Sequence, residues 1–179
     1  GVRALCTLFQ NLPALHAGIL VVQHMPRFIQ PSFVRTLRDH TSMSVDLARS
    51  GDVLGAGTVL LAPAESHCVL EGNRHIRLVT GPKVHFVCPA IDVTMKSVVA
   101  PATRNALIGI ILTGMGRDGA DGMVHLKQFG ARTMAQDQAS SAVFGMPMEA
   151  WKAGGTDLLL PPERIALTLT RWVPQARTA

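Results

Sequence analysis

Residues 105–121, NALIGIILTGMGRDGAD, contain the pattern that decides the fold. Residues 106–112 form a short apolar run rich in Ile, which is typical of a buried central strand. Three glycines follow within residues 114–119, and the apolar spacing from Ala120 onward predicts a helix. A strand, a glycine-rich turn and a helix in this order indicate an open α/β sheet. In such a sheet the turn lies at the carboxyl end of a strand, where ligands bind, so Asp118 is a candidate site residue.

The rest of the chain extends this α/β pattern in both directions. Helices are predicted at residues 2–12, 28–39, 91–100, 120–129 and 147–151, and after the Pro pair at 161–162, with Leu167 among the inward apolar residues of the last. Strands are predicted at residues 18–23, 45–48, 59–62, 68–70, 76–79, 106–112 and 132–136. The three strands between residues 59 and 79 are separated by turns, and we expect them to form an antiparallel insertion at the sheet edge.

Length and composition favour a single cytoplasmic domain spanning residues 1–179. The 47% hydrophobic content suits one good core, and no apolar run reaches the ~20 residues of a membrane span. The beginning lacks the pattern of a signal peptide, and three widely spaced cysteines argue against disulfides and zinc. The net charge of +5 is scattered, with no Tyr and two Trp, which disfavours nucleic acid and leaves an acidic protein partner open.

The glycine-rich turn also matches a dinucleotide-binding fingerprint. Gly114, Gly116 and Gly119 spell GxGxxG between a strand and a helix, and Asp137 follows the next strand at the distance expected of a ribose ligand. Two features oppose this interpretation. Asp118 would place a carboxylate where the pyrophosphate lies, and the motif falls in the second half of the chain.

Asp118 has three further interpretations. It could bind a metal together with Asp121 and His125, although these two lie on the helix and Asp118 lies in the loop; it could simply cap the helix. The third interpretation involves His24, which follows the strand at 18–23. Both residues come just after strand ends, so the fold could bring them together, with the carboxylate on Nδ1 orienting His24 as a general base. The other histidines, including His85, are interpreted as surface or packing residues.

A nucleophile is harder to find. Ser140 and Ser141 follow Asp137 in a loop, and neither has the GxSxG setting of a nucleophile elbow.

Four motifs in matching order resemble the catalytic domain of the chemotaxis protein-glutamate methylesterases, the CheB family. These are the segments VQHMP at 22–26, LAP at 61–63 with His67 after it, LTGMGRDGA at 112–120, and AQD at 135–137 through VFGMP at 143–147. The resemblance covers nearly the whole chain. It implies a doubly wound α/β fold with a mostly parallel sheet and helices on both faces, and hydrolysis of glutamyl methyl esters on the cytoplasmic helices of chemoreceptors, often with glutamine deamidation. It implies no cofactor, no metal and no membrane insertion.

The resemblance also assigns roles within a Ser-His-Asp triad. His24 corresponds to the catalytic base and Asp118 to the orienting acid, while Met115, between Gly114 and Gly116, lies where the family helps form the oxyanion pocket. The family's serine stands in a Ser-Thr-Gly-Gly turn after a first strand, and residues 1–5 resemble the continuation of that turn. We therefore expect the strand and serine to precede Gly1, and a receiver domain can lie further upstream.

One motif departs from the family pattern. Residues 88–92 read Cys-Pro-Ala-Ile-Asp where the family usually has Arg-Pro-Ser-Val-Asp, which bears on substrate recognition. The alternative from another functional class is a catalytically silent binding module on the same fold.

Overall fold

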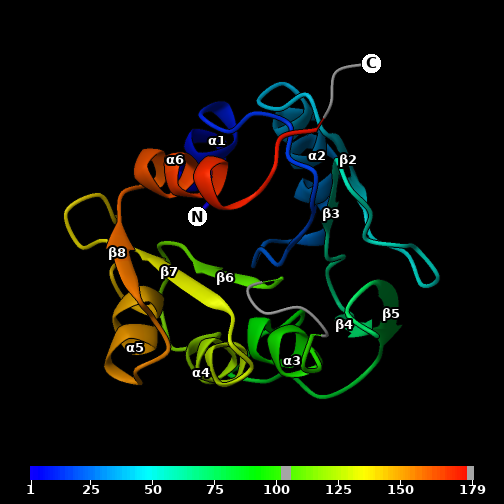
Figure 1. Ribbon diagram of the computed structural model, residues 1–179. Helices are drawn as coiled ribbons and strands as arrows, with labels where there is room; N and C mark the ends of the chain where they lie inside the picture. Colours follow the sequence, from blue (N-terminus) through cyan, green and yellow to red (C-terminus); the bar gives the residue numbers. More distant parts are fainter. Residues whose placement is uncertain (102–105, 177–179) are drawn as a thin grey trace.

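The computed structural model describes residues 1–101 and 106–176, so Asn105 of the quoted stretch lies outside the described residues. It is an α/β fold whose parallel strands carry helices on both faces (Figure 1). The helices are α1 (Val2–Gln10), the short 3₁₀ helix η1 (Arg27–Ile29), α2 (Gln30–Arg38), α3 (Ile91–Lys96), α4 (Ala120–Gln128), α5 (Met146–Lys152) and α6 (Pro162–Trp172). The strands are β1 (Gly18–Val21), β2 (Ser44–Leu47), β3 (Thr58–Leu61), β4 (His67–Glu71), β5 (His75–Val79), β6 (Ile108–Ile111), β7 (Arg132–Gln136) and β8 (Leu158–Leu160).

The strands form two parallel groups and one hairpin. In the first group β3 lies between β1 and β2, and in the second β7 lies between β6 and β8. The hairpin pairs β4 with β5 antiparallel. The two parallel groups are seen on opposite sides of the molecule in Figure 1, with β6 facing the group that contains β3.

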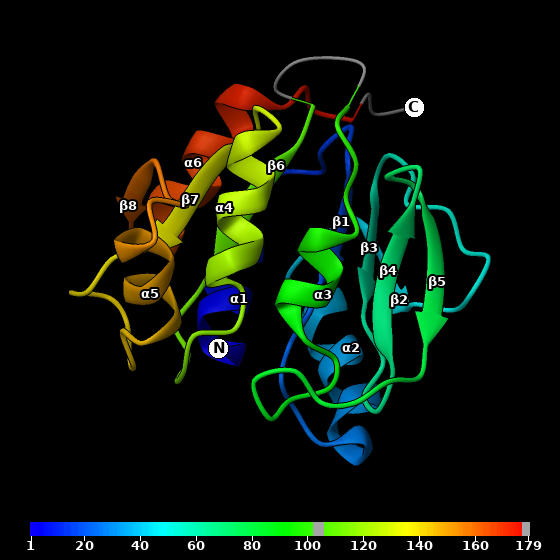
Figure 2. The same ribbon diagram turned by 90° about the horizontal axis from the view of Figure 1, so that it is seen from below.

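Two helical layers cover these strands. On one face α1 contacts α2 and α6, and apolar residues of the three helices share one core, among them Phe9, Leu37 and Ile165. On the other face α3, α4 and α5 lie side by side (Figure 2), and Ile91, Met123 and Met146 build a second core with Ile111 of β6. The apolar spacing in the sequence placed most of these side chains inward because helical residues three and four apart share a face.

Four details of the predicted elements were wrong. The strand predicted at 59–62 corresponds to β3 and is not part of the antiparallel insertion. It pairs in parallel with β1 and β2, because the chain crosses back through α2 before β2 and through residues 48–57 before β3. The helix predicted at 91–100 ends at Lys96. The strand β8 was not predicted, since its three residues are too few to show a period. Leu167 is exposed, because α6 directs Ile165, Ala166 and Leu169 to the core.

A cavity of about 900 Å³ separates β1 from β6. Apolar residues of both strands line it, including Ile19, Val21, Ile108 and Ile110. Among the described strands, β1 pairs only with β3 and β6 only with β7, so each has one edge facing this cavity.

Within the described ranges, no helix is long and apolar enough to cross a lipid bilayer.

Candidate active site

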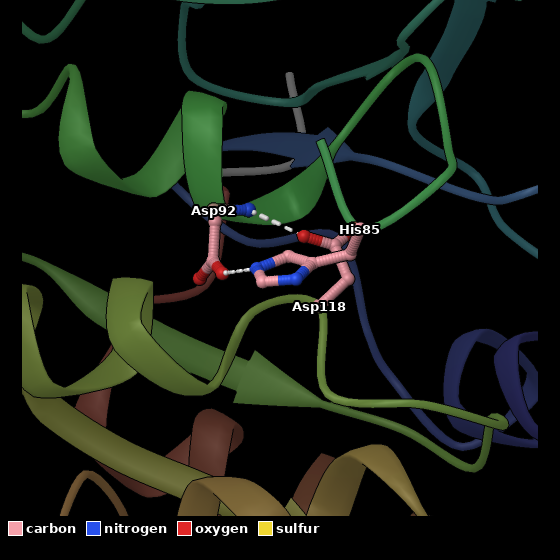
Figure 3. A group of neighbouring side chains, drawn as sticks. All are labelled: His85, Asp92 and Asp118. Carbon is pink, nitrogen blue, oxygen red and sulfur yellow. Dashed lines mark hydrogen bonds and ion pairs between the residues drawn. The ribbon is translucent and has the colours of Figure 1, made fainter. Parts of the chain in front are cut away.

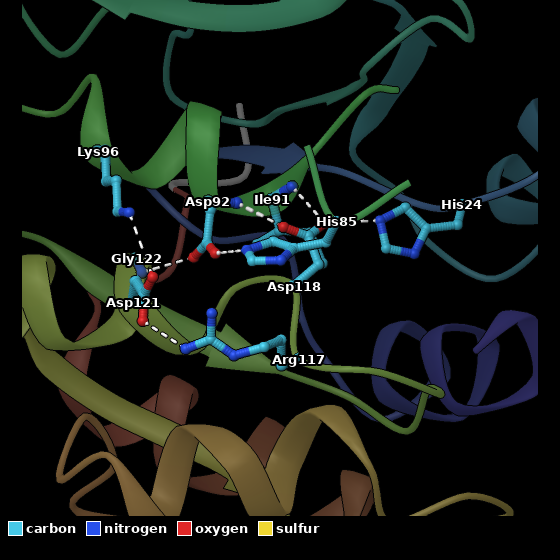
Figure 4. Close-up of polar contacts among 9 residues, drawn as sticks. All are labelled: His24, His85, Ile91, Asp92, Lys96, Arg117, Asp118, Asp121 and Gly122. Carbon is cyan, nitrogen blue, oxygen red and sulfur yellow. Dashed lines mark hydrogen bonds and ion pairs between the residues drawn. The ribbon is translucent and has the colours of Figure 1, made fainter. Parts of the chain in front are cut away.

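His24 and Asp118 meet at the carboxyl ends of β1 and β6. His24 Nε2 lies 2.8 Å from Asp118 Oδ2 (Figure 4). The imidazole is 27% exposed, whereas the carboxylate is almost fully buried. The residues are 94 positions apart in the chain, and they meet because both strands end at the same edge of the fold. The ring nitrogen differs from the expected Nδ1: the contact uses Nε2, which leaves Nδ1 for another partner.

Two backbone amides hold the Asp118 carboxylate in place. Ile91 N–H donates to Oδ2 at 2.7 Å and Asp92 N–H donates to Oδ1 at 3.0 Å. These amides belong to the first turn of α3, whose N–H groups have no partner within the helix. Asp118 therefore caps α3, and the predicted capping of its own helix was wrong, since Gly119 is the N-cap of α4 and no side chain caps it.

The surroundings of Asp118 favour its ionised form. Burial alone raises the pKa of this carboxyl, but hydrogen bonds from His24 and from the N–H groups of Asp92 and Ile91 outweigh it and lower the pKa below its ordinary value. Asp118 is therefore a carboxylate at neutral pH. An ionised acceptor fixed by two amides can hold the imidazole of His24 in one orientation, which is what a general base requires.

The glycine-rich turn brings Met115 to the surface beside this pair. Gly114 N–H donates to the Val143 carbonyl at 3.1 Å, and the Gly114 carbonyl accepts from Met146 N–H at 2.8 Å, so the backbone of Gly114 is fully used. Met115 is 82% exposed, and Gly116 has a φ of 95°. In the part of the chain that the structure describes, the N–H groups of Met115 and Gly116 donate to no protein acceptor. Met115 lines the cavity, whereas the Gly116 N lies close to Gly145, where an added Cβ would come within 3.1 Å of it.

His24 and the start of the glycine-rich turn border the cavity between the two parallel groups, whereas Asp118 lies buried behind His24. Its lining includes His24, Gly114, Met115 and Gly1. Gly1 lies so close to the Gln23 side chain that a Cβ added to the glycine would come within 2.8 Å of Gln23 Nε2. The first residue of the chain and the candidate base therefore border one cavity.

The metal cluster of Asp118, Asp121 and His125, an alternative that the sequence left open, does not form. Asp121 pairs with Arg117 at 2.9 Å and Lys96 at 3.4 Å on the surface. His125 Nε2 contacts the Val98 carbonyl at 2.8 Å, so neither residue accompanies Asp118.

Asp137, the candidate ribose ligand, forms hydrogen bonds with the candidate nucleophiles Ser140 and Ser141 in a local turn. Asp137 Oδ1 accepts from Ser140, through its N–H at 3.1 Å and its hydroxyl. Ser141 Oγ donates to the Asp137 carbonyl at 2.7 Å. Asp137 thus stabilises the loop after β7, and both serines satisfy their hydroxyls there.

The sequence interpretation missed a second histidine–carboxylate pair beside Asp118. His85 Nε2 lies 2.8 Å from Asp92 Oδ2, and Asp92 is only 1% exposed. Asp92 belonged to the motif at residues 88–92, which was a usable signal. His85, in the loop between β5 and α3, carried no such signal, because its partner is fixed only by the path of that loop.

Comparison with known protein families gives a match over most of the chain. The family described as CheB methylesterase matches residues 1–169. A protein-glutamate methylesterase/protein-glutamine glutaminase of Symbiobacterium thermophilum is 44% identical over 97% of this chain, and one of Rhizobium johnstonii is 44% identical over 93%. The aligned part is 48% and 46% of those proteins, so the chain spans about half the length of these relatives.

A solved structure is similar over most of its length. The crystal structure of the Thermotoga maritima CheB methylesterase catalytic domain superposes with a TM-score of 0.87 and 33% sequence identity. The match covers 94% of this chain and 91% of that one.

Proposed function

This chain belongs to the CheB methylesterase family, and from that premise we propose that residues 1–179 form most of the catalytic domain of a protein-glutamate methylesterase. The reaction is hydrolysis of glutamyl methyl esters on the cytoplasmic helices of chemoreceptors. Glutamine deamidation at the same site is a second reaction, since the names of the relatives include a glutaminase. We place this activity in the cytoplasm, where those receptor helices lie.

The observation that carries the proposal is the 2.8 Å contact between Asp118 and His24, a residue that lines the cavity. In this proposal His24 takes a proton from a serine hydroxyl as the serine attacks the ester carbonyl, and then returns it to the leaving methanol. His24 next takes a proton from a water molecule that attacks the acyl-serine and returns it to the serine oxygen, which releases the glutamate carboxyl group. Asp118 orients the imidazole and stabilises its cationic form. General acid–base catalysis of this kind contributes typically about 10²–10⁴-fold to a rate.

The glycine-rich turn supplies the oxyanion pocket in this mechanism. The N–H groups of Met115 and Gly116 are the candidate donors, because that of Gly114 is already bonded to Val143. Gly114 contributes by its lack of a side chain, since a Cβ there would lie 2.8 Å from the Met146 side chain. One such donor is worth on the order of 10²–10³ in kcat.

We propose that the nucleophile is a serine in a segment preceding Gly1. Two facts support this assignment: β1 and β6 each present an unpaired edge to the same cavity, and Gly1 borders that cavity together with His24. A parallel strand between β1 and β6 would join the two groups into one sheet. A turn after that strand would end beside His24, which is where a serine is needed.

The test uses the full-length protein with its natural residues before Gly1 and a methylated chemoreceptor, and it measures methanol release. Replacing the serine by Ala, or His24→Gln, should abolish turnover, and Asp118→Asn should lower kcat by about 10⁴-fold. His75→Gln, in the exposed hairpin, is the matched control and should keep full activity.

Two outcomes would contradict the proposal. Methanol release that survives replacement of the upstream serine would mean that a serine within residues 1–179, such as Ser141, is the nucleophile. A folded full-length protein that binds receptor but releases no methanol would be a silent binding module.

A further inference from the structure

We propose that His85 and Asp92 are positioning residues: together they fix the Asp118 carboxylate against which His24 is oriented. This role rests on the proposed function of the His24–Asp118 pair. His24 lines the cavity and neither His85 nor Asp92 does, so in this proposal they act through Asp118.

The contacts form a continuous path from His85 to His24. His85 Nε2 contacts Asp92 Oδ2 at 2.8 Å, and the Asp92 N–H donates to Asp118 Oδ1 at 3.0 Å (Figure 3). Asp118 Oδ2 in turn contacts His24 (Figure 4). Asp92 also accepts the Gly122 N–H at 2.6 Å (Figure 4). Asp92 thus connects the first turn of α3, which holds Asp118 by two amides, to the first turn of α4, which follows Asp118 directly.

The cluster is better described as a hydrogen-bond network than as a metal site. The ligand atoms of His85, Asp92 and Asp118 lie within 4.8 Å of one another, as a divalent ion would need. However, each carboxylate oxygen already has an N–H partner: Asp92 accepts from His85 and Gly122, and Asp118 accepts from His24 and the start of α3. A cation would have to displace these bonds.

The buried carboxylates of Asp92 and Asp118 lie side by side, and each needs donors that offset its negative charge. Each of them has one histidine as a partner. Asp118 has His24 on its outer side, and Asp92 has His85 on its outer side. The other charges nearby, Asp121 with Lys96 and Arg117, are paired with one another at the surface beyond Gly122 (Figure 4). Without His85, Asp92 would keep a single donor next to Asp118, and the two carboxylates would separate. Any shift of Asp118 moves the imidazole of His24.

Two variants separate the effect of the hydrogen bond from the effect of side-chain bulk at position 85. His85→Leu keeps an apolar body and removes the donor to Asp92, whereas His85→Gln keeps an N–H donor. We expect His85→Leu to lower kcat of the full-length enzyme by about tenfold or more with KM unchanged, because a small misplacement of the base slows only the chemical step. His85→Gln should keep most of the activity, and the double variant with Asp92→Asn should be no slower than Asp92→Asn alone.

A second readout does not depend on esterase activity. With ¹⁵N-labelled histidine in the full-length protein, the His24 imidazole signals should shift in His85→Leu and remain near their normal positions in His85→Gln. His75→Gln is the control and should change neither the spectrum nor kcat. If the normal enzyme shows no esterase activity while the His24 signals respond to His85→Leu, the proposed function fails and the positioning role stands.

Unchanged His24 signals and unchanged kcat in folded His85→Leu would overturn the positioning role. A change in KM alone, or fully additive losses in the double variant, would also overturn it. If Asp92→Asn does not fold, the comparison of His85→Leu with His85→Gln decides the matter by itself, since His85 is partly exposed.

Discussion

Asp118 is the residue on which the site depends, because it makes one contact with His24 and two with α3. A carboxylate in this position contributes to stability as well as to orientation. Its pKa is lowered on folding, so its contribution is fully present above its ordinary value of 3.8 and is lost as the pH falls through the lower pKa of the folded protein.

The lowered pKa of Asp118 leads to a prediction for Asp118→Asn. At neutral pH the variant should lose about 1–3 kcal/mol of unfolding free energy, since a charge-assisted acceptor of buried N–H groups is removed. The difference between the two proteins should stay constant above the ordinary pKa of 3.8 and shrink as the pH falls below it and through the lowered pKa of the folded protein, because the normal carboxyl then becomes protonated as well. Urea unfolding at several pH values measures it. The other carboxylates with lowered pKa values, Asp121 and Asp157, are present in both proteins and cancel. A difference that stays constant with pH would contradict the assigned direction.

At the scale of elements, Gln30 fastens α2 to the chain that follows β3. Its side chain is 2% exposed; Nε2 donates to the Ala62 carbonyl at 3.0 Å, and Oε1 accepts the Ala64 N–H at 2.9 Å. One amide thus satisfies a donor and an acceptor of a buried backbone segment. The same segment leads away from the parallel sheet toward the hairpin, so its position affects how both are placed.

Gln30→Ala should therefore cost about 1–3 kcal/mol of unfolding free energy, because a buried carbonyl and a partly buried N–H of the backbone lose their partner. Gln10→Ala, an exposed glutamine at the end of α1, is the matched control and should change stability by less than about 0.5 kcal/mol. Urea or thermal unfolding compares the two. Equal effects would mean that water replaces the Gln30 amide at no cost.

At the scale of the molecule, the cavity between β1 and β6 divides the parallel strands into two groups. Unpaired strand edges next to apolar walls are unfavourable, since buried N–H and C=O groups need partners. In a protein that also carries the residues preceding Gly1, we expect a strand to occupy this space and to pair with both edges.

Hydrogen exchange by mass spectrometry can test this expectation on the longer protein. Peptides covering β1 and β6 should exchange much more slowly than in residues 1–179 alone. Peptides covering β2 and β8, the outer strands of the two groups, are internal controls and should be unchanged. Equal exchange of β1 and β6 in both proteins would show that no strand binds there.

The periodic elements of this chain were predictable because their signals are local. Apolar spacing located α1, α2 and α4 with their inward residues, and the run at 106–112 located β6. Strand-end positions also selected His24 and Asp118 as neighbours, since parallel strands end at a common edge. The parallel pairing of β3 could not be predicted from the sequence, because pairing depends on the path of the chain. The strand β8 could not be predicted either, because three residues show no period.

The sequence by itself determined the α/β class, the order of most elements and the two residues expected to meet at the strand ends. Only the tertiary structure decided that His24 uses Nε2, that Asp118 caps α3, and that His85 and Asp92 form a second pair behind it. The reason is physical: a period reports which face of an element is apolar, through contacts of residues three or four apart. Hydrogen bonds between side chains and the backbone of a distant helix depend on distances of a few tenths of an ångström, which are fixed only when the helices and loops are packed together.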